Sequence, residues 1–366
     1  MGGEEATNVA EAFTSNWIAP VGPHIHAFER QIAQYVGTEG CVAVNSGTAA
    51  IHLALQVLNV QPNDVVLCQS FTFAATAFPI VYCEAKPIFI DSEPDTWNMD
   101  PVLLKQCIED CLQKGTKPKA IIVVHLYGMP AKMHAIMSIA NQYNIPVIED
   151  AAEALGSQYE NHQCGSLGNI GIFSFNGNKI ITTSGGGALV SNNTYWLQKA
   201  AYLATQAKDA TPFYQHQTIG FNYKLSNVLA GIGCGQMQVL NDRIYSRRNI
   251  YHQYQMALAN DERITFLNEP ANCYSNRWLT TILLPSAVSG ANEAIRKTLA
   301  AQKIECRLLW KPLHEQPVFQ SYQRYTNGVS NQLFERGLCL PSGSNLSESQ
   351  FSYIIYAFKK ALDAVC

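Results

Sequence analysis

The sequence is poor in charge and has no long apolar run. Only 14% of its 366 residues are Asp, Glu, Lys or Arg, and 25 basic against 28 acidic residues give a formal charge of −3. No basic run could follow a phosphate backbone, and no apolar stretch approaches the roughly 18 residues of a membrane span. The start also lacks the basic and then apolar layout of a signal peptide. These absences argue against nucleic-acid binding and against a membrane protein, and we expect a cytoplasmic protein.

Cysteine is plentiful but lacks the spacing that builds a site. The eleven cysteines are odd in number, are scattered from Cys41 to Cys366, and include no C-x-x-C pair. Neither a disulfide framework nor a zinc site fits this arrangement, so no metal centre is expected. We interpret most of them as small buried apolar residues of a reducing compartment.

The first 190 residues alternate short β-branched runs with longer amphipathic stretches. This alternation is typical of a mostly parallel sheet covered by crossover helices. Helical spacing of apolar residues is found in 49–58, 72–83, 101–112 and 133–143. The seven expected strands are residues 41–44, 65–67, 87–90, 120–125, 146–149, 170–175 and 187–191.

The sequence pattern changes after Asn222, and this change predicts a second domain with its boundary near residue 240. Residues 226–258 contain no proline, repeat apolar residues at helical spacing and predict one long or broken helix. Two strand-like stretches, 278–284 and 303–308, and an amphipathic helix over 348–365 follow. We therefore expect a large α/β domain over residues 1–240 and a smaller C-terminal α/β domain over 241–366.

Lys179 lies in a polar turn between two strand-like segments, five residues after Ser174 and just before three consecutive glycines. A lysine held among strand ends can lose its charge by desolvation, and a neutral amine is the nucleophile that forms a Schiff base with an aldehyde. The alternative is an ordinary turn lysine that reaches into water.

Asp150 ends a buried-strand pattern, residues 145–150. Ligands of parallel sheets bind outside the carboxyl ends of the strands. A carboxylate there could pair with the protonated pyridine nitrogen of pyridoxal 5'-phosphate (PLP). The alternative is that Asp150 caps a following helix.

Residues 44–50, Val-Asn-Ser-Gly-Thr-Ala-Ala, run from a strand into a helix through small residues. Their backbone N–H groups and hydroxyls would face an anion at the positive helix end. The stretch is neither G-x-G-x-x-G nor a Walker loop. A single phosphate is therefore the expected ligand.

The order and spacing of these features resemble those of fold-type I PLP-dependent aminotransferases. The amino-acid sequence of the motifs resembles the DegT family of sugar-nucleotide aminotransferases. The resemblance runs from residues 16–22 to residues 337–343. Within that family, several stretches look most like the transaminases that form the UDP-4-amino sugar of bacillosamine synthesis. These stretches are residues 149–157, 175–187, 205–207, 275–278 and 307–310. Relatives usually carry further residues before a segment like Met1-Gly-Gly-Glu-Glu, so contacts from that region are not assumed.

The resemblance implies a role for each cofactor contact. Lys179 would hold PLP as a Schiff base and, once displaced, move a proton between the amine-bearing carbon and the cofactor. Asp150 would keep the ring nitrogen protonated. The remaining contacts would be Phe73 and Ala152 on the two ring faces, Gly47, Thr48 and Ser174 at the phosphate, and Glu153 near the phenolic oxygen, where many relatives carry His or Gln.

The resemblance also implies a homodimer with shared active sites. The segment 220–226 matches the family segment whose asparagine, here Asn222, reaches the phosphate of the neighbouring subunit's PLP. Without the resemblance, a loop asparagine satisfying its own backbone is the simpler interpretation. The candidate substrate contacts are Trp17, Tyr127, Arg277, Arg307 and His314, although an arginine can equally form a surface ion pair.

The expected reaction moves an amino group from L-glutamate to C4 of a nucleotide-linked 4-keto-6-deoxy sugar. UDP-2-acetamido-2,6-dideoxy-4-keto-hexose is favoured by the likeness above. The alternatives are a GDP-perosamine synthase-like aminotransferase, a sugar dehydratase of the same family, and a non-enzymatic PLP-binding regulator. The dehydratases carry His where this chain has Lys179, and a regulator would have no evident use for Lys179, Asp150 and Ser174 together.

Overall fold

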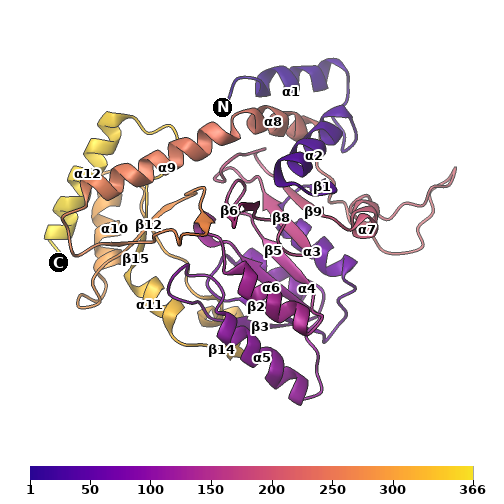
Figure 1. Cartoon of the computed structure of the whole chain (residues 1–366). Helices are drawn as coiled ribbons and strands as arrows, with labels where there is room; N and C mark the ends of the chain where they lie inside the picture. Colours follow the sequence, from indigo (N-terminus) through magenta and orange to yellow (C-terminus); the bar gives the residue numbers. More distant parts are fainter. Residues whose placement is uncertain (366) are drawn as a thin grey trace.

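The chain, described here over residues 1–365 of a computed structural model, builds one large sheet covered by helices and a smaller sheet beside it (Figure 1). The large sheet has the order β1-β9-β8-β5-β4-β2-β3-β14, in which only β9 runs antiparallel to its neighbours. Its strands are β1 (Gly40–Val44), β2 (Val65–Gln69), β3 (Lys86–Ile90), β4 (Ala120–Val124), β5 (Val147–Asp150), β8 (Ile170–Ser174), β9 (Gly187–Ser191) and β14 (Arg324–Tyr325). The α/β fold with a mostly parallel sheet is confirmed.

All seven strands expected from the sequence are present, but the sheet has an eighth. β14 comes from the C-terminal part of the chain and pairs in parallel with β3, with Arg324 opposite Phe89 and Tyr325 opposite Ile90. Two residues between polar neighbours give too little alternation to be recognised as a strand. The expectation of seven strands is therefore corrected to eight.

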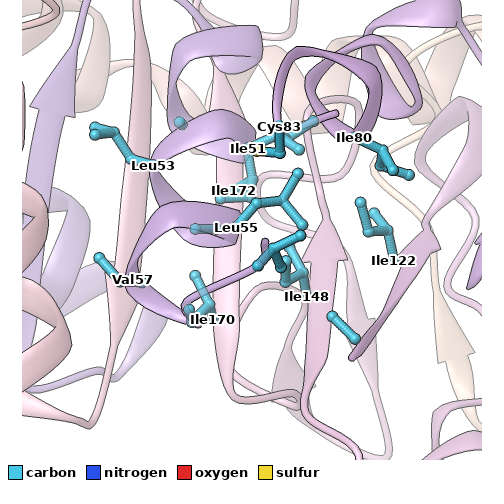
Figure 2. Packing of buried hydrophobic residues seen from close by; sticks show 14 of the residues in the cluster. Ile51, Leu53, Leu55, Val57, Ile80, Cys83, Ile122, Ile148, Ile170 and Ile172 are labelled. Carbon is cyan, nitrogen blue, oxygen red and sulfur yellow. The ribbon is translucent and has the colours of Figure 1, made fainter. Parts of the chain in front are cut away.

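Helices cover both faces of the large sheet because successive side chains of its strands point to opposite sides. In β4, Ile122 belongs to the apolar cluster on the face covered by α3 (Gly47–Val57), α4 (Phe78–Tyr82) and α7 (Thr194–Ala204). Figure 2 shows the apolar side chains of α3 meeting Ile122, Ile148, Ile170 and Ile172 of the sheet. On the other face, Ile121 and Val123 pack toward α5 (Pro101–Gln113) and α6 (Met133–Gln142).

Two expected helices differ in detail. The stretch 72–83 forms a short 3₁₀ turn, η1 (Ala74–Thr76), followed by the one-turn helix α4. Pro79 explains the break, because it has no N–H and belongs in the first turn of a helix. The long stretch after Ser226 is broken at Val239 into α8 (Asn227–Gln238) and α9 (Leu240–Ala257).

The N-terminal helices pack on α8. α1 (Glu5–Thr14) and α2 (Pro23–Val36) lie beside it (Figure 1), and the Asn227 side chain accepts the His24 N–H at 2.9 Å. This layer covers the sheet next to β1, β8 and β9 through buried Phe28, Phe173 and Phe175.

A second, antiparallel sheet of order β10-β12-β15-β13 is built from the C-terminal part. Helix α9 leads to it (Figure 1), and Tyr254 of that helix is fully buried in its core. The elements are β10 (Thr265–Phe266), β12 (Thr280–Leu283), α10 (Ala291–Ala301), β13 (Arg307–Leu308), η3 (Leu313–Glu315), η4 (Pro317–Phe319), α11 (Val329–Arg336), β15 (Gly337–Leu340) and α12 (Glu348–Asp363). A two-domain division at residue 240 remains a prediction.

Short elements connect the two sheets. A third sheet joins β11 (Cys273–Tyr274) to β6 (Gln158–Tyr159) and β7 (His162–Gln163), and η2 (Leu126–Gly128) follows β4. Segments after β5 and before β12 are thereby fixed to each other, which matters for the site below. Within residues 1–365, no helix is both long and apolar enough to cross a membrane.

Candidate active site

A cavity of about 350 Å³ opens at the carboxyl ends of β4, β5 and β8. The sheet edge supplies Val124, Asp150 and Ser174 as wall residues. The cavity gathers eight of the nine expected cofactor contacts, which are Gly47, Thr48, Phe73, Asp150, Ala152, Glu153, Ser174 and Lys179. Residues separated by more than a hundred positions thus meet where a parallel sheet places its ligands.

Lys179 lies in the loop between the antiparallel strands β8 and β9. The loop is held by two bonds to Phe175, whose carbonyl oxygen accepts the Thr183 N–H at 2.9 Å and the Thr182 hydroxyl at 3.1 Å. The Lys179 side chain is only 13% exposed, and its Nζ is 3.5 Å from Glu153 Oε1. It also lies 4.4 Å from the centroid of the Trp278 ring. The amine therefore points into the cavity and does not reach into bulk water.

Asp150 ends β5 with a buried carboxylate. Its Oδ2 accepts the Thr76 hydroxyl at 2.7 Å and its Oδ1 accepts the Ala152 N–H at 3.3 Å. No helix begins at Asp150, since the chain continues in turns. Burial raises the pKa of Asp150, although the Thr76 bond and the Lys179 charge oppose this. A cation brought next to this carboxylate would favour its ionised form.

Behind Asp150 lies a fully buried pair, His125 and Glu149, with 2.8 Å between Nε2 and Oε2. His125 Nδ1 accepts the Ala131 N–H at 3.0 Å, so the neutral ring carries its proton on Nε2 and donates it to Glu149. The backbone N–H of His125 donates to the Asp150 carbonyl oxygen at 3.1 Å. This pair joins the ends of β4 and β5 and fixes the backbone that carries Asp150.

The N-terminus of α3 forms the opposite end of the cavity. Ser46 caps the helix by accepting the Ala49 N–H at 3.1 Å, which leaves the first N–H groups, those of Gly47 and Thr48, without intrahelical partners. A Cβ on Gly47 would lie 3.1 Å from the Cβ of Ser174. A Cβ on Gly187 would lie 2.5 Å from the Gly47 nitrogen, so glycine is required there for the close approach of β9 to the helix.

Aromatic side chains form the remaining wall. Phe73 is 53% exposed and lies 5.3 Å from Trp310 between ring centroids. Tyr127 stacks on Trp278 and on Trp310, and its hydroxyl oxygen accepts the backbone N–H of Trp310 at 2.9 Å. Phe73 thus offers a free ring face to a planar ligand, while the other three rings brace one another.

Asn222, the ninth expected contact, does not line this cavity. It is exposed, its Oδ1 accepts from Gln206 Nε2 at 3.0 Å, and its carbonyl oxygen accepts from Asn45 Nδ2 at 3.2 Å. Asn45 does line the cavity, so Asn222 lies just outside its rim. Contact with a neighbouring subunit's cofactor remains a prediction.

The five candidate substrate contacts are not brought to the cavity wall. Trp17 is exposed, and Tyr127 lies buried behind Trp310. Arg277 stacks on Tyr251 and donates to the Leu267 carbonyl oxygen at 2.7 Å. The two others are Arg307, paired with exposed Glu305, and His314, whose Nδ1 is 2.6 Å from the Ser70 hydroxyl. Their roles toward substrate remain predictions.

Comparison with known proteins matches nearly the whole chain. The profile of the DegT/DnrJ/EryC1/StrS aminotransferase family matches residues 1–359. This chain belongs to that family. It is 52% identical over 359 residues to the putative pyridoxal phosphate-dependent aminotransferase EpsN of Bacillus subtilis (strain 168), across 97% of this chain and 92% of that protein.

Some relatives in the DegT/DnrJ/EryC1/StrS family are named after the sugar that they act on or make. A GDP-perosamine synthase of Caulobacter vibrioides is 34% identical over 366 residues, across 99% of this chain and 96% of that protein. Among solved structures, the PLP form of the putative sugar aminotransferase Spr1654 from Streptococcus pneumoniae superposes with a TM-score of 0.91 at 27% identity. That match covers 99% of this chain and 97% of the other. The chain is thus a PLP-dependent sugar aminotransferase of this family.

The cavity suits PLP on three counts of its own chemistry. The α3 N-terminus offers N–H groups and the Thr48 and Ser174 hydroxyls to a phosphate. The buried Asp150 carboxylate matches a protonated ring nitrogen, and Lys179 supplies an amine for an aldehyde. Among residues 1–365, no group of three or more His, Cys, Asp or Glu is placed to hold a metal ion.

Three members of this DegT-family site were not singled out from the sequence. Thr76 donates to Asp150, Trp278 lies against Lys179, and Trp310 lines the cavity. Both tryptophans end stretches that carry the family resemblance, 275–278 and 307–310, which is a signal that could have found them. Thr76 had no such signal, because it follows the expected helix pattern and contacts Asp150 only through the fold.

Proposed function

We propose that this chain transfers the amino group of L-glutamate to C4 of UDP-2-acetamido-2,6-dideoxy-4-keto-hexose, giving the UDP-4-amino sugar of bacillosamine synthesis. The observation that carries the proposal is the composition of one cavity. Lys179 and Asp150 share it with walls from 149–157, 175–187, 275–278 and 307–310. Those four are among the five stretches that resemble the UDP-4-amino sugar transaminases; the fifth, 205–207, does not line the cavity.

In this proposal, the residues of the chain bind and orient the cofactor. Gly47, Thr48 and Ser174 hold the phosphate, and Asp150 holds a proton on the ring nitrogen. When bound, PLP supplies the electron sink that stabilises negative charge at the amine-bearing carbon. With PLP bound, Lys179 would hold the cofactor through its amine between turnovers and, once displaced, would carry the proton to and from the amine-bearing carbon.

Aromatic and small side chains position the ring and limit water. Phe73 covers one ring face and Ala152 contacts the other. Trp310 lines the cavity, and its Nε1 is buried without a hydrogen-bond partner among the described residues. An unpaired buried donor is costly, and an oxygen of the bound sugar would satisfy it.

We also propose a homodimer in which Asn222 of each chain completes the phosphate site of the other.

A second candidate is a GDP-linked 4-keto-6-deoxy sugar as acceptor. It is favoured by the GDP-perosamine synthase relative, which matches nearly the full length of both chains. Both candidates use the same cofactor site. Their acceptors differ in the nucleotide and in the 2-acetamido group, which only the UDP-linked sugar carries.

One assay separates them. Purified protein is incubated with L-glutamate and either the UDP-linked or the GDP-linked 4-keto sugar, and the amino sugar is measured by mass spectrometry. We expect kcat/KM to favour the UDP sugar by at least about 10²-fold. The reason is that groups placed to hydrogen-bond one base are left unpaired when the other base is bound. A preference for the GDP sugar would reverse the assignment, and turnover of neither would remove both.

A further inference from the structure

Glu153 and Lys179 form a buried acid and base pair inside the cavity. Glu153 Oε1 lies 3.5 Å from Lys179 Nζ, and their side chains are only 6% and 13% exposed. The Trp278 ring covers the amine from another side, 4.4 Å from its centroid. A proton leaving Lys179 therefore meets the Glu153 carboxylate before it meets bulk water.

The Glu153 side chain is held so that only one oxygen faces Lys179. Its Oε2 accepts the Tyr127 N–H at 2.7 Å, while Asn276 Nδ2 donates to its backbone carbonyl oxygen at 3.0 Å. Tyr127 keeps a φ of 55°, which is costly for a residue other than glycine. The surrounding contacts maintain this backbone and thereby keep Oε1 toward Lys179.

The groups that face this pair favour Glu153 as the one that changes protonation. Burial raises the pKa of Glu153, with the Lys179 charge opposing and the Asp150 charge adding to the rise. The neighbouring Tyr127 and Cys339 are buried and have their pKa values raised far enough to stay protonated at neutral pH. A carboxylate that readily accepts a proton thus lies beside an ammonium that must lose one.

We propose that Glu153 is the proton acceptor for Lys179, a catalytic residue that touches the reacting amine. An ammonium has no lone pair, so Lys179 first passes one proton to Glu153 Oε1. The Nζ lone pair then bonds to the aldehyde carbon, and the carbonyl oxygen leaves as water with the two remaining amine protons. Glu153 keeps that proton while the displaced Lys179 amine acts at the amine-bearing carbon. It returns the proton only when the reaction runs in reverse and the cofactor leaves. The inference rests on the proposed role of Lys179.

Glu153→Gln tests the idea with little structural change, since the amide oxygen can still accept the Tyr127 N–H. The readout is the rate at which apoprotein captures PLP, followed by visible absorbance across the neutral pH range. We expect the wild-type rate to vary little with pH, because the proton moves within the site. The variant should capture PLP about 10²-fold more slowly at neutral pH and speed up as pH rises.

If Glu153 had a purely electrostatic role, the PLP capture rate of Glu153→Gln would change in the opposite direction. If Glu153 only stabilises the ammonium, its loss favours the free amine, and the variant captures PLP as fast as wild type or faster. That result would overturn the proposal. Glu109→Gln, the same change at an exposed position of α5, serves as the matched control and should leave the capture rate unchanged.

Calorimetry in buffers of different ionisation enthalpy independently measures the number of protons released when PLP binds. On binding PLP, Glu153→Gln should release about one more proton to the buffer than wild type, and equal counts would overturn the proposal. Borohydride trapping separates the two levels of inference. A label on Lys179 with unchanged capture removes only the role of Glu153, whereas a label elsewhere removes the proposed role of Lys179 as well.

Discussion

Trp278 lies against Lys179 while holding the neighbouring residue of the same loop. Its ring centroid is 4.4 Å from Lys179 Nζ, and its Nε1–H donates to the Asn178 carbonyl oxygen at 2.7 Å. The backbone N–H of Trp278 in turn donates to Asn276 Oδ1 at 2.9 Å. Because Asn276 also binds the carbonyl oxygens of Glu153 and Leu155, one tryptophan links the lysine loop to the turn after β5.

Replacing Trp278 by phenylalanine should loosen the lysine loop. The change removes the donor to Asn178, about 1 kcal/mol, and weakens the cation–π contact, about 1 kcal/mol. We expect the variant to have a lower melting temperature and to lose PLP faster on dialysis. Trp196→Phe on α7, away from the cavity, is the control for loss of an indole. Equal PLP retention in the two variants would show that Trp278 does not position Lys179.

Lys179 should be the residue that holds the cofactor. Purified protein is expected to be yellow, and borohydride should fix the cofactor to the peptide that contains Lys179. Lys179→Ala should keep PLP or its amine form bound without a covalent link, yet lose transamination, because the phosphate and ring contacts remain. Lys105→Ala, on the exposed face of α5, should behave as wild type. Substantial turnover by Lys179→Ala would contradict the assignment.

Asp150→Asn should separate stability from activity. Burial raises the pKa of Asp150 above its ordinary value of 3.8, so the folded apoprotein binds more protons than the unfolded chain as this group titrates. Stability therefore falls as the pH rises through that range and stays lower at neutral pH. The uncharged amide removes this cost, and the apoprotein should melt about 2–4 °C higher.

The same variant should lose about 10²-fold or more in kcat, since an amide does not balance the charge on the ring nitrogen. Differential scanning fluorimetry of the apoprotein and steady-state kinetics of the holoenzyme supply the two measurements. A variant that melts lower and turns over normally would mean that Asp150 serves the fold alone.

The proposed shared site makes a prediction for mixed dimers. If Asn222 of one subunit completes the phosphate site of the other, mixing Lys179→Ala with Asn222→Ala chains gives heterodimers with one intact site and one doubly altered site. Activity should rise above that of either parent. Mixing Lys179→Ala with Asp150→Asn is the control, because both residues belong to one chain's cavity and no intact site forms. Confirmed heterodimers without recovered activity would place the action of Asn222 within its own chain.

The fold and the centre of the site were predictable because both follow from local pattern. The buried β-branched runs predict β2, β4 and β5, and the polar residues at their carboxyl ends predict the cavity that contains Asp150. β14 was not predictable, since two residues carry no periodic signal and pair only because β3 has a free edge. The contact between Thr76 and Asp150 was equally hidden, because it depends on where Pro79 breaks the expected helix.

The placement of β14 also bears on how the protein is made. The edge of β3 is open until residues 324–325 pair with it, and the Asp91 carboxylate just beyond β3 binds the N–H groups of Asn327 and Gly328 at 3.1 and 3.0 Å. During synthesis the large sheet is therefore complete only after residues 324–325, near the C-terminal end of the chain, have been made. A fragment that stops at residue 240 would present an uncovered strand edge, which is a template for aggregation. The two parts of the chain should accordingly unfold in a single transition.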